Sequence, residues 1–365
     1  MCNLSHYPKT MLILGAGFSK NFRLPLTSEI LTKGYNKVVS EYPNFQIMFL
    51  IEWLRLIGGR PFETMNYEEM LSRVDLEITY ISDYSDKKVK YSLWKLRDSI
   101  IQVLWEALNE NLNQDDIAQL DRFFTRLSKP VGIISFNQDL LIETYFERRK
   151  IIWSYGIPVS NFTLPRPEKP EVQFLRGKKQ NNNARVSPTF NYYHAKNPAY
   201  ILLKMHGSFN WQFCPNCHDV QILPLVESGA VGRPYKPIGD IGRLCAKPSC
   251  MEKIHSQSAY SNLIVPPTVY KNFDNPLLRN IWEKAKRYIT KAKSIYIIGY
   301  SFSSVDVLAN WMLFESTLEN NCLKEIVIID PDENVKNNIE RLIPKKYHPI
   351  IKRENSLEEL RTGNL

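Results

Sequence analysis

Four cysteines fall in one part of this sequence and are its clearest candidates for metal binding. Cys214 and Cys217 have the tight spacing of zinc sites, whereas Cys245 and Cys250 are slightly further apart than usual. Two close pairs of thiolates can complete a tetrahedral Zn²⁺ site and hold together a segment too small for its own core. His218 could replace a ligand, but four cysteines make that unnecessary. A closed four-cysteine site leaves no position for a substrate, so the expected zinc is structural, and four reduced thiols are the alternative.

Polar residues or glycines follow five apolar runs, at the point where each run ends. Apolar runs bounded in this way are typical of strands buried on both faces of a parallel sheet. The carboxyl ends of such strands meet at one edge, where open α/β sheets bind ligands. The five ends carry Gly15-Ala16-Gly17, Asn137-Gln138-Asp139, His206-Gly207, Gly299-Tyr300-Ser301 and Asp330.

The glycine loop after the first apolar run is a candidate site for a nucleotide diphosphate. Glycine lets the backbone come close to a ligand, and free N–H groups at a helix start favour an anion. We therefore expect the diphosphate on Gly15, Ala16 and Gly17. The full dinucleotide pattern has a third glycine that is missing here, so an ordinary strand-to-loop turn is the alternative.

The other polar strand ends each have a functional and a structural interpretation. Asp330 is placed to bind a ribose diol, or it is a turn residue before Pro331. Asn137 or Asp139 could cap the following helix, although capping explains only one of the two. His206 could be a structural histidine, but its position at a strand end favours a function.

Strands alternating with helices predict an α/β fold, a Rossmann-like doubly wound parallel sheet. The catalytic domain would comprise residues 1–27 and 130–342, interrupted by a helical insertion over 28–129. It would contain a zinc-binding module at 211–254, and residues 343–365 would form a charged C-terminal tail. Strands are expected at residues 11–14, 131–136, 200–205, 294–298 and 325–329, and helices at 45–54, 67–81, 91–108, 116–127, 140–149, 276–291, 305–318 and 333–342.

The length, apolar content and net charge of the chain limit the classes of protein to which it can belong. With 365 residues, 44% of them apolar, the chain can bury a substantial core. No apolar run is long enough to span a membrane and none before the first strand suits a signal peptide, so we expect a cytoplasmic protein. The net charge of +9 could favour an anionic partner, but dispersed lysine is usually a solvated surface, so direct nucleic-acid contact is unsupported.

These motifs, in this order, resemble the sirtuin superfamily over about residues 11–330. The family pattern is a Gly-Ala-Gly-x-Ser loop, an Asn-x-Asp strand end, a His-Gly strand end, a four-cysteine zinc module, a Val-Pro-Pro stretch and a late Gly-x-Ser. The matching residues here are Gly15 to Ser19 (with Phe18 at the variable position), Asn137 to Asp139, His206-Gly207, the four cysteines, Val265-Pro266-Pro267 and Gly299 to Ser301.

Departures from the pattern indicate a branch of this superfamily. Deacylase sirtuins follow the glycine loop with an acid and an Asp-Phe-Arg-type element, where this chain has Leu24-Pro25-Leu26-Thr27. With Asn66-Tyr67-Glu68-Glu69 inside a helical insertion, the chain looks like the sirtuin-like NADases of bacterial anti-phage defence. The resemblance implies hydrolysis of NAD⁺ to nicotinamide and ADP-ribose. It also implies a homo-oligomer or a separate partner, such as a HerA-type ATPase or an Argonaute, as the trigger.

The resemblance also implies roles for the residues at the strand ends. Asn137 would orient a water or a ribose hydroxyl, His206 would act as general base, and Asp139 would orient hydroxyls by hydrogen bonding. NAD⁺ would bind on Gly15, Ala16, Gly17, Phe18, Ser19, Gly299, Ser301 and Asp330, with the two serines donating to the diphosphate. An NAD-dependent protein deacylase and a non-catalytic nucleotide-binding module are the alternatives, and a dehydrogenase is a more distant one.

Overall fold

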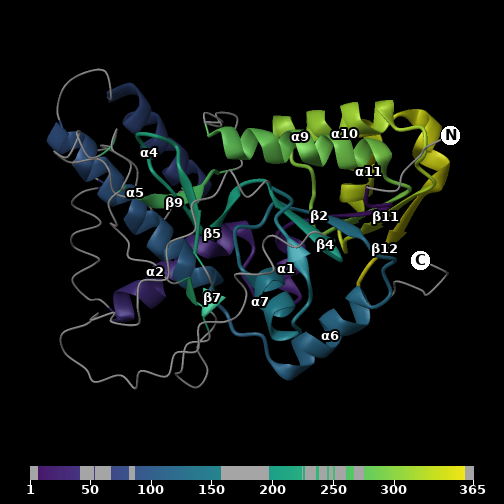
Figure 1. Cartoon of the computed structure of the whole chain (residues 1–365), viewed down its shortest axis with the longest axis horizontal. Helices are drawn as coiled ribbons and strands as arrows, with labels where there is room; N and C mark the ends of the chain where they lie inside the picture. Colours follow the sequence, from purple (N-terminus) through teal and green to yellow (C-terminus); the bar gives the residue numbers. More distant parts are fainter. Residues whose placement is uncertain are drawn as a thin grey trace.

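The computed structural model shows a large α/β domain with a cluster of helices at one end (Figure 1). It describes residues 7–41, 53, 67–81, 87–157, 197–223, 225–226, 236–237, 245, 250, 260–266 and 275–357. The expected helix at 45–54, the residue Asn66 and Pro267 lie outside these ranges, apart from the buried Trp53.

A seven-stranded parallel sheet forms the centre of the domain, as the buried apolar runs predict. Its order is β12-β11-β10-β1-β2-β4-β3, and every pairing is parallel. The strands are β1 (Thr10–Leu14), β2 (Val131–Ser135), β3 (Trp153–Ser154), β4 (Tyr200–Lys204), β10 (Ser294–Ile298), β11 (Glu325–Ile329) and β12 (Ile351–Glu354). The registers bring the carboxyl ends of β1, β2, β4 and β10 to one edge.

The C-terminal segment differs from the charged tail expected at 343–365. Residues Lys345–Ile350 form the 3₁₀ helix η4, and β12 then pairs in parallel with β11 as the edge strand. Only Ile351 of this strand is buried. An edge strand has a largely solvated surface and tolerates charge, so no apolar run marks it in the sequence.

Two layers of helices cover the sheet (Figure 1). Helices α9 (Pro276–Lys291), α10 (Val307–Glu319) and α11 (Glu333–Leu342) lie on one face. Helices α6 (Gln114–Phe124) and α7 (Leu141–Arg148) lie on the other. This arrangement is the doubly wound architecture expected from the alternation of strands and helices.

Within the residues that the structure describes, the insertion between β1 and β2 contains three long helices. Helices α2 (Thr27–Glu41) and α4 (Tyr67–Ile81) both pack against α5 (Lys87–Leu108). Helix α6, expected within the same insertion, instead packs beside α7. The hydroxyl of Tyr145 in α7 donates to the carboxylate of Asp121 in α6, and Phe124 stacks on Tyr145. The position of α6 in the sequence did not show that this helix packs beside α7 and not with the insertion.

A small antiparallel sheet connects the insertion with the main sheet. It contains β5 (Gly207–Phe213), β6 (Val220–Ile222) and β9 (Ser261–Ile264), and a short pair, β7 (Leu225–Val226) and β8 (Lys236–Pro237), lies in the same part of the sequence. Arg97 of α5 donates to the carbonyls of Asn262 (3.0 Å) and Ile264 (2.8 Å). The next residue, Val265, donates its N–H to the His206 carbonyl, so the insertion is fixed to the strand beside His206.

Candidate active site

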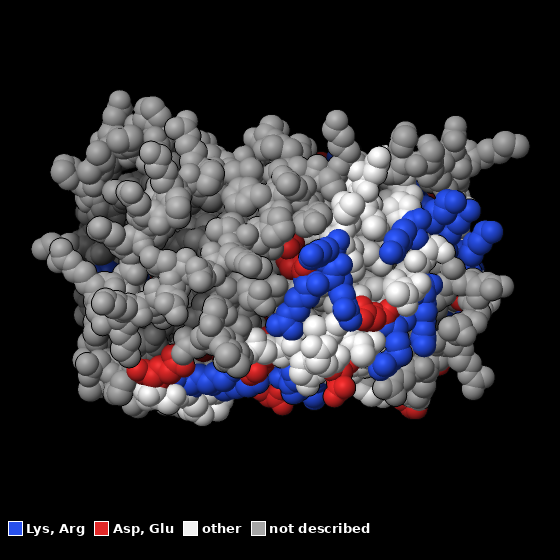
Figure 2. Space-filling view, turned by 60° about the horizontal axis from the view of Figure 1, so that its bottom comes forward, with Lys and Arg blue, Asp and Glu red and all other residues white. Residues whose placement is uncertain are grey.

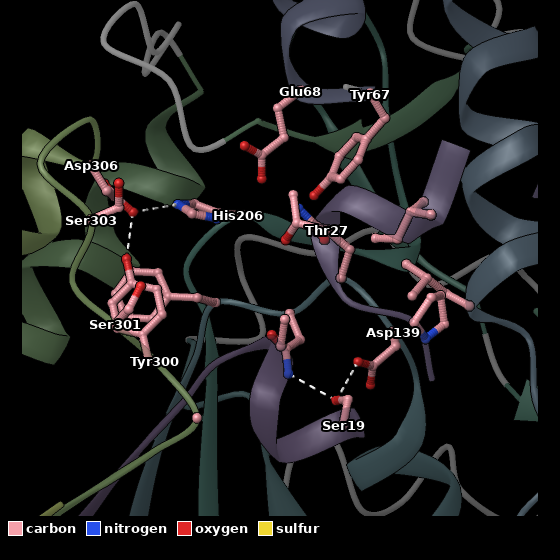
Figure 3. Close-up of a pocket in the computed structure, with 18 of the residues that line it drawn as sticks. Ser19, Thr27, Tyr67, Glu68, Asp139, His206, Tyr300, Ser301, Ser303 and Asp306 are labelled. Carbon is pink, nitrogen blue, oxygen red and sulfur yellow. Dashed lines mark hydrogen bonds and ion pairs between the residues drawn. The ribbon is translucent and has the colours of Figure 1, made fainter. Parts of the chain in front are cut away.

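A cavity of about 300 Å³ opens at the carboxyl edge of the parallel sheet (Figure 3). The loops after β1, β2, β4 and β10 form its floor and sides, and helices α2, α4 and α5 of the insertion contribute the remaining wall. Its lining includes Ala16, Ser19, Thr27, Tyr67, Glu68, Phe136, Asn137, Gln138, Asp139, His206, Gly299, Tyr300, Ser301, Ser303, Val305 and Asp306. The location agrees with the ligand crevice expected for this class of sheet.

One group of polar side chains lies between the first and second strand ends. Ser19 Oγ donates to Asp139 Oδ2 (2.7 Å), and Asn137 Nδ2 donates to Ser19 Oγ (2.9 Å). Asn137 Nδ2 also donates to the carbonyl of Gly15 (2.9 Å). Because a carbonyl can only accept, this contact fixes the orientation of the amide and leaves its oxygen as the atom that could accept from a ligand.

Asp139 uses both carboxylate oxygens inside the protein. Oδ2 accepts from Ser19, and Oδ1 accepts from the backbone N–H of Leu141 at the start of α7 (3.0 Å). The residue is 4% exposed. It therefore orients Ser19 and caps a helix at the same time, which combines the two interpretations made from the sequence.

A second polar group lies between the ends of β4 and β10. His206 Nε2 is 3.8 Å from Asp306 Oδ2, and the Tyr300 hydroxyl donates to the same oxygen (2.6 Å). Both His206 and Asp306 are almost fully buried. Asp306 also caps α10, since its Oδ1 accepts from the N–H of Ala309. Burial and the neighbouring Asp306 carboxylate raise the pKa of Tyr300 well above its usual value, so the phenol stays protonated.

Aromatic packing and a glycine position these two groups. The rings of Phe136 and Tyr300 stack in parallel with centroids 4.0 Å apart, and the His206 ring packs edge-on against Phe136. After His206 the chain turns at Gly207, whose φ is +78°. A Cβ there would lie 1.8 Å from the Leu263 carbonyl oxygen, so only glycine allows β5 to approach β9 this closely.

The insertion contributes an acidic side chain to the cavity. Glu68 lies in the first turn of α4, and its carboxylate points into the space between Tyr67 and His206 (Figure 3). Burial, and then the Glu68 charge, raise the pKa of Tyr67. Glu68, Asp139 and Asp306 are the acids of the described lining, which contains no lysine or arginine. Such a cavity favours positive charge in a ligand or transition state.

The glycine loop is used differently from the expected diphosphate cradle. The N–H of Gly15 donates to the Ile298 carbonyl, and that of Gly17 donates to the Gly299 carbonyl (2.9 Å). Added Cβ atoms at Gly15 or Gly17 would lie within 3 Å of Gly299 or Tyr300 backbone atoms. The two glycines therefore permit close packing of two backbones, and their N–H groups already have acceptors.

The structure brings together most, but not all, of the residues predicted for the site. Those lining the cavity are Ala16, Ser19, Asn137, Asp139, His206, Gly299 and Ser301. Gly15, Gly17 and Phe18 are outside the described lining, and Phe18 packs in the core against Phe22 and Phe123. Asp330 is outside the described lining. Its carboxylate accepts from the Asp332 N–H, which is the turn geometry considered as the alternative.

A buried ion pair lies behind the Asn-Gln-Asp loop. Lys204 Nζ, at the end of β4, is 3.2 Å from Glu143 Oε1 of α7, and both side chains are almost fully buried. The hydroxyls of Tyr155 and Ser208 also donate to Glu143. Lys204 Nζ donates to the carbonyl of Asp139 as well, so the pair connects β4 and α7 to the loop that carries Asn137.

The four cysteines lie close together, although the pair Cys214 and Cys217 is separated from the pair Cys245 and Cys250 by 28 or more residues of sequence. All four Sγ atoms lie within 4.8 Å of one another, with Cys214–Cys250 at 3.8 Å and Cys217–Cys245 at 3.7 Å. Zn–S bonds of about 2.3 Å in a tetrahedron separate the sulfurs by about 3.8 Å. The four thiols are therefore positioned to hold a structural zinc, and they do not line the cavity.

The described surface in Figure 2 carries charges of both signs. Lysine and arginine side chains gather over the described part of the face that this figure turns forward, with acidic side chains among them. Arg149, at the end of α7, forms an ion pair with Asp121 of α6. None of the helices in the described ranges has the length and hydropathy needed to cross a membrane.

Comparisons with known proteins find similar solved structures but no matching sequence family. No family model matches the sequence, and no match is found among curated proteins. The chain is similar to solved structures of Sir2. A Sir2 complex with the inhibitor EX-527, 2'-O-acetyl-ADP-ribose and a deacetylated p53 peptide matches at 12% identity and a TM-score of 0.37, over 98% of this chain and 92% of the other. A Sir2 homologue variant with ADP-ribose matches at 13% identity and the same TM-score, over 98% and 90%.

Sequence reasoning missed several residues of the cavity, among them Asp306, Tyr300 and Glu68. Asp306 precedes a helix and has the ordinary signature of a helix cap, which hides its contact with His206. Tyr300 lies inside a motif noted only for its glycine and serine. Glu68 lies in the first turn of α4, where an acid is favourable for any helix, and only the packing of the insertion shows that it reaches the sheet edge.

Proposed function

We propose that this chain is a sirtuin-like NAD⁺ hydrolase, which cleaves the bond between nicotinamide and ribose to give nicotinamide and ADP-ribose. The observation that carries the proposal is the pairing of two polar groups around one cavity. His206 with Asp306 lies on one side, and Asn137 with Ser19 lies on the other. The motifs that resemble the sirtuin pattern supply most of these residues.

The chemistry of this bond suits an acidic cavity. As neutral nicotinamide leaves, positive charge develops on the ribose ring. Carboxylates held in a partly desolvated site stabilise that charge, and Glu68 and Asp306 are available for this role. The described lining contains no lysine or arginine that would oppose the transfer of positive charge from the nicotinamide ring to the ribose.

His206 and Asn137 would manage the attacking water. The amide oxygen of Asn137 can accept from the water or from a ribose hydroxyl, because both of its N–H protons are directed to Gly15 and Ser19. The His206 imidazole would take a proton as the water oxygen bonds to the anomeric carbon. Asp306 would stabilise the resulting imidazolium, and Asp139 would position Ser19 and therefore Asn137.

The diphosphate would need donors other than the two glycines. Ser19 directs its hydroxyl proton to Asp139, so the exposed hydroxyl of Ser301 is the better donor of the two serines. Neither Asp330 nor the N–H groups of Gly15 and Gly17 enters this proposal. Zinc, when bound by the four cysteines, would stabilise the small sheet that holds β5 and take no part in bond cleavage.

The wider role follows from the resemblance stated above. We propose a cytoplasmic NAD-depleting effector of anti-phage defence, controlled by oligomerisation or by a separate partner such as a HerA-type ATPase or an Argonaute. An NAD-dependent protein deacylase is the second candidate, because the four cysteines fit the zinc module of that class. The missing Asp-Phe-Arg-type element disfavours it.

Release of nicotinamide from NAD⁺, without any acylated peptide, tests the proposal. We expect the purified chain to release nicotinamide and ADP-ribose, and His206→Ala and Asn137→Ala to abolish release. His348→Ala, which lies in η4 outside the cavity, is the matched control and should retain full activity. Release that requires an acyl-lysine peptide would favour the deacylase. Binding of NAD⁺ without turnover, in the presence of candidate partners too, would favour the non-catalytic module.

A further inference from the structure

Exposed large apolar side chains are concentrated on helix α10. Of the seven in the described residues, four lie on this helix and a fifth, Val305, immediately precedes it. The four are Val307, Trp311, Phe314 and Leu318, with exposed fractions of 56, 49, 41 and 49%. We call them the apolar stripe.

The apolar stripe lies on the face of α10 that points away from the protein. At 100° per residue its four members fall within about 60° of the helix circumference. The buried residues of the helix, among them Met312, Leu313 and Ser316, occupy the opposite side. A helix that is apolar on both faces is normally covered on both faces.

The neighbouring helices of the same layer show that this pattern is specific to α10. The exposed positions of α9 include Arg279, Glu283 and Arg287, and those of α11 begin with Glu333 and Asn334. Helix α10 lies beside α9 along the edge drawn at the top of Figure 1. Solvent-facing positions in this layer are therefore polar except on α10.

We infer that the apolar stripe is the contact surface for a second copy of this chain, packed antiparallel about a two-fold axis. The spacing of the stripe is four, three and four residues, which is symmetric about the midpoint between Trp311 and Phe314. In an antiparallel pair, Val307 faces Leu318 of the second copy and Trp311 faces its Phe314. A two-fold contact requires such a self-complementary surface.

The charges and the apolar area beside the stripe are compatible with a second copy. Lys286 pairs with Glu315 (3.9 Å) and Glu319 (3.3 Å) within one chain and lies 5.1 Å from the centroid of the Trp311 ring. The exposed fractions correspond to on the order of 400 Å² of apolar surface per copy, which is within the range of functional patches. Two copies would bury about 800 Å² of this surface, and residues around the stripe would supply the rest of the roughly 1,200–2,000 Å² of a stable dimer.

Sedimentation velocity of the full chain over a wide range of concentration tests this inference, which does not depend on the proposed enzymatic activity. We expect a dimer for the unmodified chain. Val307→Lys alone and Leu318→Glu alone should each raise the dimer dissociation constant about tenfold or more. Ile152→Lys, at a side chain of equal exposure elsewhere, should have no effect.

The double variant Val307→Lys with Leu318→Glu distinguishes the antiparallel pair from other contacts. Each lysine then faces a glutamate of the second copy at both ends of the stripe, so dimerisation should recover. Equal thermal melting of the variants under monomeric conditions shows that they are folded. A monomeric unmodified chain, dimers that persist in both single variants, or failure of the double variant to recover would each overturn the inference.

Discussion

His206 Nε2 lies 3.8 Å from Asp306 Oδ2, and both side chains are almost fully buried. The two residues come from distant parts of the sequence, after β4 and before α10. Tyr300 donates to the same carboxylate oxygen, which restricts the position of Asp306. If His206 acts as the general base, the neighbouring carboxylate stabilises the imidazolium that forms.

Asp306→Asn tests this pairing. The amide keeps the size of the side chain and can still cap α10, but it lacks the charge. We expect kcat for nicotinamide release to fall about 10²- to 10⁴-fold, the usual range for loss of acid–base assistance, with little change in KM. Asp332→Asn, at the cap of α11, is the matched control. Unchanged kcat in Asp306→Asn would exclude a role for this carboxylate in turnover.

Ser19→Ala removes two hydrogen bonds, the one that Ser19 donates to Asp139 and the one that it accepts from Asn137. The Asn137 amide keeps only its contact with the Gly15 carbonyl, so its oxygen is less well oriented. We expect kcat to fall and the free energy of unfolding to decrease by about 0.5–1.5 kcal/mol. Ser301→Ala, at an exposed serine of the same cavity, should leave the stability unchanged. An unchanged kcat in Ser19→Ala would contradict this role.

Glu68→Gln tests the contribution of the insertion. Removing a charge that stabilises a cationic transition state should lower kcat about 10- to 100-fold. The neighbouring Glu69 is exposed and outside the cavity, so Glu69→Gln provides a control in the same helical turn. Steady-state kinetics on both variants measure the difference. Equal activities of the two variants would show that the Glu68 charge has no part in turnover.

Zinc content measures the cysteine site directly. We expect one zinc ion per chain by elemental analysis, and loss of the metal with a lower melting temperature in Cys217→Ser. His218 has a positive φ, which asparagine tolerates, so His218→Asn is the suitable control and should retain the zinc. Retention of zinc in Cys217→Ser would show that another residue completes the site.

The pair of Lys204 and Glu143 predicts a strong coupling energy. Lys204→Met leaves the buried carboxylate of Glu143 without its partner and should cost about 3–5 kcal/mol of unfolding free energy at neutral pH. Lys204→Met combined with Glu143→Gln removes both charges and should cost less than the sum of the single variants. Chemical denaturation of the four proteins measures this double-mutant cycle, and additive losses would contradict it.

The same glutamate gives a pH dependence with a defined sign. Burial raises the pKa of Glu143 above its unfolded value, only partly offset by Lys204. The folded state therefore holds the proton to higher pH than the unfolded state. The stability that Glu143 contributes is therefore full below its pKa in the unfolded state and is lost as the pH rises through its pKa in the folded state. Glu143→Gln should remove this part of the pH dependence.

The sequence predicted the elements that are marked by local patterns. Buried apolar runs identified β1, β2, β4, β10 and β11, and the bounds of α4, α9 and α11 agree with the helical spacing. The convergence of the four cysteines also followed from their spacing. In these cases, the residues that decide the structure are close together in the chain.

The features that sequence reasoning missed depend on distant contacts. Strand β12 has the charged sequence of an edge, and α6 joins the sheet through contacts of Asp121 and Phe124 with α7. The N–H of Gly17 was expected to bind phosphate but donates to Gly299, a residue far along the chain. A local sequence pattern does not determine which acceptor a backbone N–H group bonds to when that acceptor is distant in the chain.

The central position of β1 has a consequence for synthesis of the protein. Residues 10–14 leave the ribosome well before residues 294–298, which form one of their two partner strands. Until that strand emerges, one side of β1 lacks its partner, and the cavity lacks Tyr300 and Asp306. Pairing over such separations slows folding. Incomplete chains would therefore lack a formed cavity, so any activity of this cavity would begin only after β10 has paired with β1.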